Sequence, residues 1–224
     1  MGTNGKQVLV VAAHPDDEVL GAGGTIARHG AAGDSVYVAI LTEGASIQFP
    51  GRPEMMVVKK NHALHAAQIL GAKELFFGNF DDQKLDVLPL TAVVSFLEPV
   101  VEKIRPAVIY THHFTELNRD HRIAYEATSV TARPFRDTCL ERLLCFSVDT
   151  VSDWGQGTAQ YNVFTDISDT LDAKLRALEV YETEVRPAPH PRSLETLRQI
   201  AYRNGAMVGL KAAEMFQLIV EVRR

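Results

Sequence analysis

Short apolar runs alternate with helical patterns along most of this 224-residue chain, and this alternation limits the folds open to it. Runs rich in Val, Ile and aromatic residues predict strands, and apolar residues at helical spacing predict helices between them. The expected strands are residues 8–12, 36–41, 74–77, 107–111, 143–147, 162–166 and 214–222. The expected helices are residues 23–32, 53–70, 90–104, 121–131, 168–181 and 193–208. This order predicts an α/β fold with a mostly parallel sheet and helices on both faces.

Composition and charge narrow the function classes. Hydrophobic residues make up 46% of the chain and charged residues 23%, as in ordinary globular proteins. We expect a single domain over residues 1–224. The formal net charge of −5 and the lack of a Lys/Arg-rich block argue against a nucleic-acid partner. The apolar run at residues 8–13 is too short to span a bilayer, so we expect a cytoplasmic protein without a membrane span.

The segment "VLVVAAHPDDEVLGAGG", residues 8–24, ends an expected buried strand in polar residues. His14 and Asp17 stand three residues apart, and Pro15 restricts the backbone between them. In a helical turn both side chains face the same way, and imidazole and carboxylate are standard zinc ligands. We therefore expect His14 and Asp17 to bind Zn²⁺. Asp16, which has no ligand role, is expected to act as general base.

A second His/Asp cluster, "THHFTELNRDHR" at residues 111–122, follows another expected strand. The carboxyl ends of parallel strands share one edge of the sheet, where the active sites of α/β enzymes lie. A catalytic zinc site needs three protein ligands, and we expect His121 to be the third. Asp120, beside it, is expected to support catalysis. Together the two clusters favour metal-assisted hydrolysis of an unreactive amide.

Two segments, "AAHPDDEVLGAGGTIA" at residues 12–27 and "THHFTELNRDHRIAYEA" at residues 111–127, resemble the PIG-L/LmbE-like N-deacetylases. The resemblance extends through residues 41–44, 66–86 and 166–193, and so covers most of the chain. It implies a Rossmann-like fold, a Zn²⁺ cofactor and removal of acetyl from an N-acetylglucosamine-type sugar or its conjugate.

The resemblance also implies site residues and an assembly state. Carried over by position, the metal ligands of the family fall on His14, Asp17 and His121, and its general base falls on Asp16. The small-molecule partner is then an N-acetylated amino sugar, and the protein is expected to form a homo-oligomer, either a trimer or a hexamer.

Two departures from the family pattern concern substrate binding. Some members have an oxyanion-stabilising His three residues before the last metal ligand, where this chain has Asn118. Either the Asn118 amide donates there, or His112 or His113 supplies an imidazole. Where many members carry an arginine that binds the substrate, this chain has Lys59, which keeps the charge but loses the bidentate fork.

Three further residues are candidates for substrate contact. His190 and Arg192 lie in the proline-rich segment "RPAPHPRS", residues 186–193, from which both could reach the site. Trp154, in the segment "SDWGQG", could stack on a sugar ring.

The sequence also bears on three alternative function classes. A nucleotide-dependent oxidoreductase would suit glycines after the first strand, but "GAGG" at residues 21–24 lacks the third glycine of G-x-G-x-x-G. A non-catalytic metal- or sugar-binding protein of the same fold would be marked by loss of Asp16, and Asp16 is present. A metal-dependent hydrolase of another amide is the remaining alternative.

Overall fold

The computed structural model describes residues 5–133, 139–148 and 159–223. Its strands are β1 Gln7–Ala12, β2 Ser35–Thr42, β3 Glu74–Phe80, β4 Val108–His112, β5 Arg142–Phe146, β6 Val163–Asp166 and β7 Ala213–Glu221. Its helices are α1 Asp17–Ala31, α2 Glu54–Leu70, the 3₁₀ turn Leu85–Val87, α3 Leu90–Ile104, α4 Arg119–Thr131, α5 Leu171–Glu179 and α6 Leu194–Ala206. Within the described residues, no helix is both long and apolar enough to cross a membrane.

The seven strands form one sheet in the order β3-β2-β1-β4-β5-β7-β6. Strands β1 to β5 pair in parallel, whereas β7 pairs antiparallel with both β5 and β6. The expected mostly parallel sheet is therefore confirmed. Strands β1 and β4 lie side by side at its centre, so the two polar segments that follow them are neighbours in space although the sequence separates them widely.

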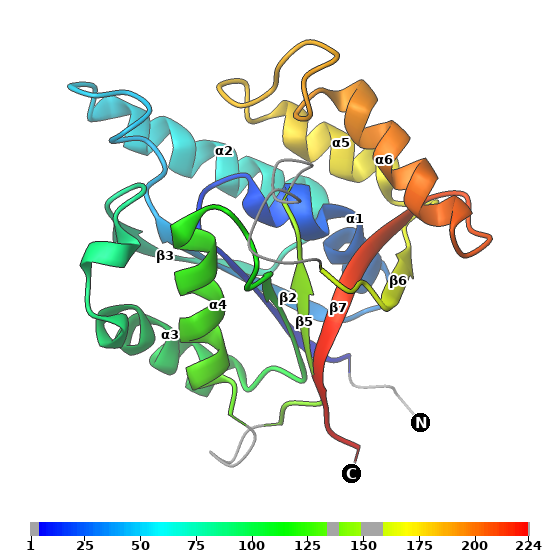
Figure 1. Ribbon diagram of the computed structural model, residues 1–224, viewed down its shortest axis with the longest axis horizontal. Coiled ribbons are helices and arrows are strands. Elements are labelled where there is room, and N and C mark those ends of the chain that lie inside the picture. Colours follow the sequence, from blue (N-terminus) through cyan, green and yellow to red (C-terminus); the bar gives the residue numbers. More distant parts are fainter. Residues whose placement is uncertain (1–4, 134–138, 149–158, 224) are drawn as a thin grey trace.

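Helices cover both faces of this sheet (Figure 1), as expected. Alternate residues of β1 face opposite sides because side chains alternate along a strand. Val8 and Val10 pack in a core with α1, α2, α5 and α6. Leu9 and Val11 pack in the other core, with α3 and α4. β1 is thus buried on both faces, which explains its unbroken apolar sequence.

Helix α1 begins at Asp17, not at residue 23 as expected, and the glycines lie inside it. A Cβ at Gly21 would lie 2.2 Å from the Phe146 ring, and one at Gly24 would lie 2.7 Å from the Ile167 side chain. These glycines therefore allow α1 to approach neighbouring segments closely. The consequence for the site is that Asp17 is held in the first turn of a helix packed against the sheet.

A buried ion pair also fixes α1. The Glu214 carboxylate of β7 accepts the backbone N–H groups of Gly24 at 2.9 Å and Thr25 at 2.7 Å. The Lys174 ammonium of α5 donates to Glu214 at 2.6 Å and to the Leu20 carbonyl at 2.7 Å. Charged groups are buried at low cost only when they are paired and hydrogen-bonded, as here. This pair joins α1, α5 and β7 behind the site.

Candidate metal and active site

The turn between β1 and α1 presents its polar side chains in a fixed arrangement. The Asp17 carboxylate accepts the backbone N–H of His14 at 2.8 Å, which closes the turn. Asp16 between them has a φ of 118°, a left-handed conformation that is costly for a residue with a side chain. Both carboxylates are buried, as is the following Glu18. The carboxylates of Asp16 and Asp17 therefore have different partners, although the two residues are adjacent in sequence.

Three side-chain atoms from β1–α1 and α4 form a compact triangle. His14 Nδ1 lies 3.0 Å from Asp17 Oδ2 and 3.2 Å from His121 Nε2, and His121 Nε2 lies 3.4 Å from Asp17 Oδ2. Tetrahedral zinc ligands, each about 2.0–2.1 Å from the ion, stand roughly 3.3 Å apart. The triangle thus has the dimensions of one face of a tetrahedral metal site, with the fourth position open.

A buried atom without a partner supports a cation at this place. Asp17 Oδ1 is inaccessible to solvent and has no hydrogen-bond partner among the described residues. An ionised carboxylate oxygen in such surroundings is costly unless a cation or donor compensates it. The donors are two imidazoles and one carboxylate, a set typical of catalytic zinc, so the residues present fit the metal.

Each imidazole of the triangle has its own carboxylate partner. His14 Nε2 lies 3.2 Å from Asp120 Oδ2, and His121 Nδ1 lies 2.6 Å from Glu116 Oε2. Asp120 is itself held by the Leu85 N–H at 3.0 Å. Carboxylates in this position fix the tautomer and ring orientation of metal-binding histidines and raise their basicity. The ring nitrogens that face Asp17 are therefore the ones available to a metal.

The carboxylates around the two imidazoles favour positive charge in the cluster. Burial disfavours an imidazolium, but the carboxylates of Asp17 and Asp120 prevail and raise the pKa of His14 to about 10. Burial opposes the same change at His121, and Asp17 and Glu116 raise its pKa to about 9. Burial alone would raise the pKa of Asp17, yet the neighbouring imidazoles hold it well below its usual range. Asp17 is consequently an anion at any physiological pH.

Two further groupings of possible metal ligands among the described residues share a histidine with the triangle. One consists of His112, Glu116 and His121, and the other of His14, Asp82 and Asp120. Since the triangle already uses His14 and His121, these groupings surround the same centre and do not form separate sites.

His112 supports the centre from within the core and does not face the substrate. Its side chain is fully buried, its Nε2 accepts the Ala13 N–H at 2.9 Å, and its ring stacks on His121 with centroids 4.0 Å apart. Burial, followed by the neighbouring His121, lowers the pKa of His112 to about 4, so it is neutral. The structure therefore places His112, a candidate for contact with substrate, in the core and not on the wall of the pocket.

Asp16 lies in a buried ionic network on the other side of the turn. Arg192 Nη1 donates to Asp16 Oδ2 at 3.0 Å and to Glu184 Oε2 at 2.9 Å, and the Lys59 ammonium pairs with Glu184 Oε1. Burial raises the pKa of Asp16 to about 7, although Arg192 opposes the rise. Lys59, a candidate for contact with substrate, is 3% exposed and pairs with Glu184, so its ammonium lies in this network and not on the wall of the pocket.

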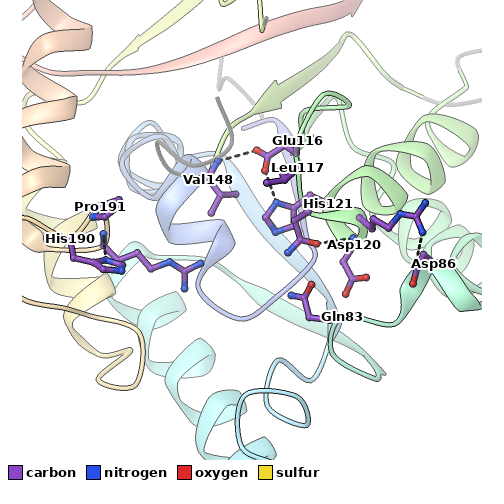
Figure 2. A pocket seen from close by; sticks show the side chains of 12 residues that line it. Gln83, Asp86, Glu116, Leu117, Asp120, His121, Val148, His190 and Pro191 are labelled. Atoms are coloured by element: carbon purple, nitrogen blue, oxygen red, sulfur yellow. Dashed lines mark hydrogen bonds and ion pairs between the residues drawn. The ribbon is translucent and has the colours of Figure 1, made fainter. Parts of the chain in front are cut away.

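A pocket of about 530 Å³ opens beside His121. Figure 2 shows His190 and Pro191 on one side of it and Glu116, Asp120 and His121 on the other. A cavity of this volume is large enough for a small organic ligand. Its walls come from the α5–α6 loop and from the segment between β4 and α4, so it lies at the carboxyl edge of the sheet.

The remaining expected site residues divide between the pocket and the interior. Asn118, His190 and Arg192 line the pocket, and the Asn118 side chain also caps α4 by accepting the Asp120 N–H at 2.9 Å. His113 Nδ1 bonds to Thr115 and its Nε2 to Gln217, each at 2.7 Å, so both ring nitrogens are engaged outside the triangle. His113 is thus bonded toward β7 and does not contact the members of the triangle. Trp154 lies outside the described residues.

Sequence reasoning missed several residues at the centre. Glu116 stands five residues before His121 in the segment already singled out, so its position there was a usable signal. Gln83 follows β3, and its side chain lies 3.0 Å from His14 Nε2. Glu184, which holds both Lys59 and Arg192, had no such signal because it lies in a helix-end segment of ordinary composition.

Comparison with known proteins places the chain in a family. The chain is 29% identical to the diacetylchitobiose deacetylase of Thermococcus kodakarensis over 96% of its own length and 83% of the relative. It is 32% identical to the 4-oxalmesaconate hydratase of Pseudomonas putida, over 55% of its own length and 50% of the relative. The crystal structure of a conserved Thermus thermophilus protein superposes with a TM-score of 0.77 at 25% identity, covering 98% of this chain and 97% of the other. The PIG-L model, described as GlcNAc-PI de-N-acetylase, matches residues 9–132, and the chain therefore belongs to the PIG-L family.

Proposed function

We propose that this protein is a zinc-dependent N-deacetylase that hydrolyses the acetamide of an N-acetylglucosamine-type sugar or its conjugate. The observation that carries this proposal is the triangle of His14, Asp17 and His121, with Asp16 next to Asp17 in the chain and His121 on the wall of a pocket. The relative named as a diacetylchitobiose deacetylase, which the chain matches over nearly its whole length, supports the same substrate class.

His14 Nδ1, Asp17 Oδ2 and His121 Nε2 would hold the metal. Zn²⁺ bound there would lower the pKa of a water molecule and polarise the acetyl carbonyl. Asp120 and Glu116 orient the two imidazoles through their outer ring nitrogens. Three protein ligands would leave a fourth position for water, as catalytic zinc requires.

Asp16 is the proposed general base. It is not a member of the triangle but adjoins Asp17 in the chain, so we assign to its carboxylate the proton of the attacking water. Water adds to the acetyl carbon, and the C–N bond then breaks. Asp16 returns its proton to the leaving nitrogen, which releases acetate and a free amine. The left-handed backbone at Asp16 has a local cost, which is the kind of strain found at functional positions.

Asn118 is the proposed donor to the developing oxyanion among the three candidates. His112 is fully buried and His113 is bonded to Thr115 and Gln217, whereas Asn118 lines the pocket. The Asn118 oxygen is used in capping α4, and this bond fixes the side chain and leaves the amide N–H groups to donate. Loss of one oxyanion donor typically lowers turnover by about 10²- to 10³-fold.

The decisive test is Asp16→Asn, with Asp172→Asn as its matched control. Asp172 carries an exposed carboxylate on α5, where it pairs with Arg198 and does not line the pocket. We expect Asp16→Asn to lower acetate release from N-acetylglucosamine conjugates by about 10²- to 10⁴-fold while the metal content of the purified protein stays the same, and Asp172→Asn to remain active. Full activity of Asp16→Asn would refute the proposed base, and loss of the metal would make Asp16 a ligand.

Hydration of an unsaturated acid is a second candidate activity, because the chain is 32% identical to a 4-oxalmesaconate hydratase over part of its length. Both reactions involve attack of an activated water, so only their products distinguish the deacetylase from the hydratase. The same wild-type preparation should be assayed for acetate release and for loss of the ultraviolet absorbance of a conjugated dicarboxylate. Loss of absorbance without acetate release would favour the hydratase.

A further inference from the structure

Four charged side chains from separate parts of the chain form a continuous series that ends at Asp16. Lys59 of α2 pairs with Glu184 after α5, Glu184 pairs with Arg192 before α6, and Arg192 contacts Asp16 in the turn after β1. The side chains of Lys59, Glu184 and Asp16 are 3%, 6% and 4% exposed, and that of Arg192 is 28% exposed. The series is therefore largely shielded from water, so its contacts are stronger than surface ion pairs.

One atom of Arg192 makes its contacts with Asp16 and Glu184. Nη1 lies 3.0 Å from Asp16 Oδ2 and 2.9 Å from Glu184 Oε2. An Nη nitrogen carries two N–H groups in the plane of the guanidinium, so one can point to each carboxylate. Glu184 therefore fixes the direction from which Arg192 approaches Asp16. Lys59, bound to the other oxygen of Glu184, fixes Glu184 in turn.

The Asp16 carboxylate needs such a restraint. Its backbone is fixed by the N–H groups of Val19 and Leu20, which bond to the Asp16 carbonyl at 3.0 Å and 2.9 Å. These bonds leave the side-chain torsions of Asp16 undetermined. Among the described residues, the hydrogen bond that holds the Asp16 carboxylate comes from Arg192. A general base has to stand within hydrogen-bond reach of the proton that it takes, so its orientation matters for turnover.

We propose that Arg192 is a positioning residue that holds the Asp16 carboxylate in its working orientation, and that Glu184 and Lys59 hold Arg192. The kinetic consequence of this inference rests on the proposed function, whereas its geometry does not. Arg192 contacts Asp16 Oδ2, so we assign the attacking water to the other oxygen, Oδ1. Lys59 then acts at a distance through Glu184 and does not contact substrate.

The kinetic test compares Arg192→Ala in the wild-type background and in the Asp16→Asn background. If Arg192 acts through Asp16, Arg192→Ala lowers kcat by on the order of 10²-fold with little change in KM, and it costs nothing further once Asp16 is already Asn. Guanidinium ions added to Arg192→Ala should restore part of kcat. An increased KM with unchanged kcat, or losses that multiply in the double variant, would instead make Arg192 a substrate contact and overturn the proposal.

Arg186→Ala is the matched control, because Arg186 lies on the same loop and its guanidinium donates to the carbonyls of Thr183 and Val185. We expect this variant to keep wild-type kcat. Glu184→Gln preserves shape and removes one charge, so it serves if Arg192→Ala folds poorly. Its kcat should fall less than that of Arg192→Ala, and a wild-type kcat in Glu184→Gln would refute the role of Glu184.

Crystal structures of the wild type and of Arg192→Ala provide a readout that requires no substrate. We expect the Asp16 carboxylate to rotate away from its wild-type position in Arg192→Ala while His14, Asp17 and His121 stay in place. An unmoved Asp16 would overturn the positioning role even in an active enzyme. If Asp16 is displaced in Arg192→Ala and the wild-type protein releases no acetate, the positioning role is supported and only the proposed deacetylase activity is refuted.

Discussion

His14 and Asp120 are 106 positions apart in sequence, yet His14 Nε2 lies 3.2 Å from Asp120 Oδ2. The contact forms because β1 and β4 are paired in parallel, so the segments that follow them meet at one edge of the sheet. It directs the opposite nitrogen of His14 toward Asp17 and His121. A residue outside the triangle thereby determines which histidine nitrogen is offered to a metal.

Weakening this contact should weaken metal binding. We expect Asp120→Asn to reduce zinc affinity by about 10- to 100-fold, because an amide orients and polarises the His14 ring less than a carboxylate does. Competition against a chromophoric chelator measures the change. Asp86→Asn, on the rim of the same pocket, is the control and should bind zinc as the wild type does. Equal affinities for Asp120→Asn and the wild type would contradict the role of Asp120.

Zinc binding should release protons. The metal-free cluster has pKa values of about 10 at His14 and about 9 at His121, so both imidazoles are protonated at pH 7. A metal binds only neutral imidazole, and its binding therefore displaces about two protons at pH 7. Affinity must then rise with pH up to these pKa values and fall as pH decreases. Calorimetry in buffers of different ionisation enthalpy counts the protons, and a count of zero would contradict this charge state.

Turnover should fall in acid through the titration of Asp16. Burial raises the pKa of Asp16 to about 7, and the positive charge of a bound metal lowers it from that value. A general base works only when deprotonated, so kcat/KM should rise with pH and level off at or below about pH 7. The residual activity of Asp16→Asn should lack this acidic limb. A limb of the same pKa in Asp16→Asn would assign it to another group.

The buried pair of Lys174 and Glu214 should dominate stability near α1. Lys174→Met leaves the Glu214 carboxylate without its cation in the interior, which typically costs about 3–5 kcal/mol. The exposed pair of Arg198 and Asp172 is the comparison, and Arg198→Met should cost less than about 1 kcal/mol. Urea unfolding of the two variants measures both values. Similar costs would show that the Lys174 pair is not a buried clamp.

The local sequence was sufficient for the elements and for the nearest part of the site. Periodicity identified the strands and the helices, because the spacing of apolar residues follows from burial on one or two faces. The H-x-x-D spacing brought His14 and Asp17 together because both belong to one turn. Pairing of parallel strands then brought His121 to the same edge, and the family resemblance named the same residues.

Helix boundaries and the choice among neighbouring polar residues were less accessible. The start of α1 was expected at Gly23, whereas the helix begins at Asp17, and Gly21 and Gly24 inside it allow close packing. His112, His113 and His121 look alike in sequence, and only the direction of each side chain separates them. His112 points into the core, His113 bonds to Gln217 of β7, and His121 faces Asp17.

By itself, the sequence determined an α/β fold with its working residues at the carboxyl ends of the strands, because those properties follow from periodicity and turn chemistry. Only the tertiary structure decided that Lys59 is buried against Glu184 and that Arg192 reaches Asp16, 176 positions away. Such contacts depend on how the α5–α6 loop packs over the β1–α1 turn, and no local spacing encodes that packing.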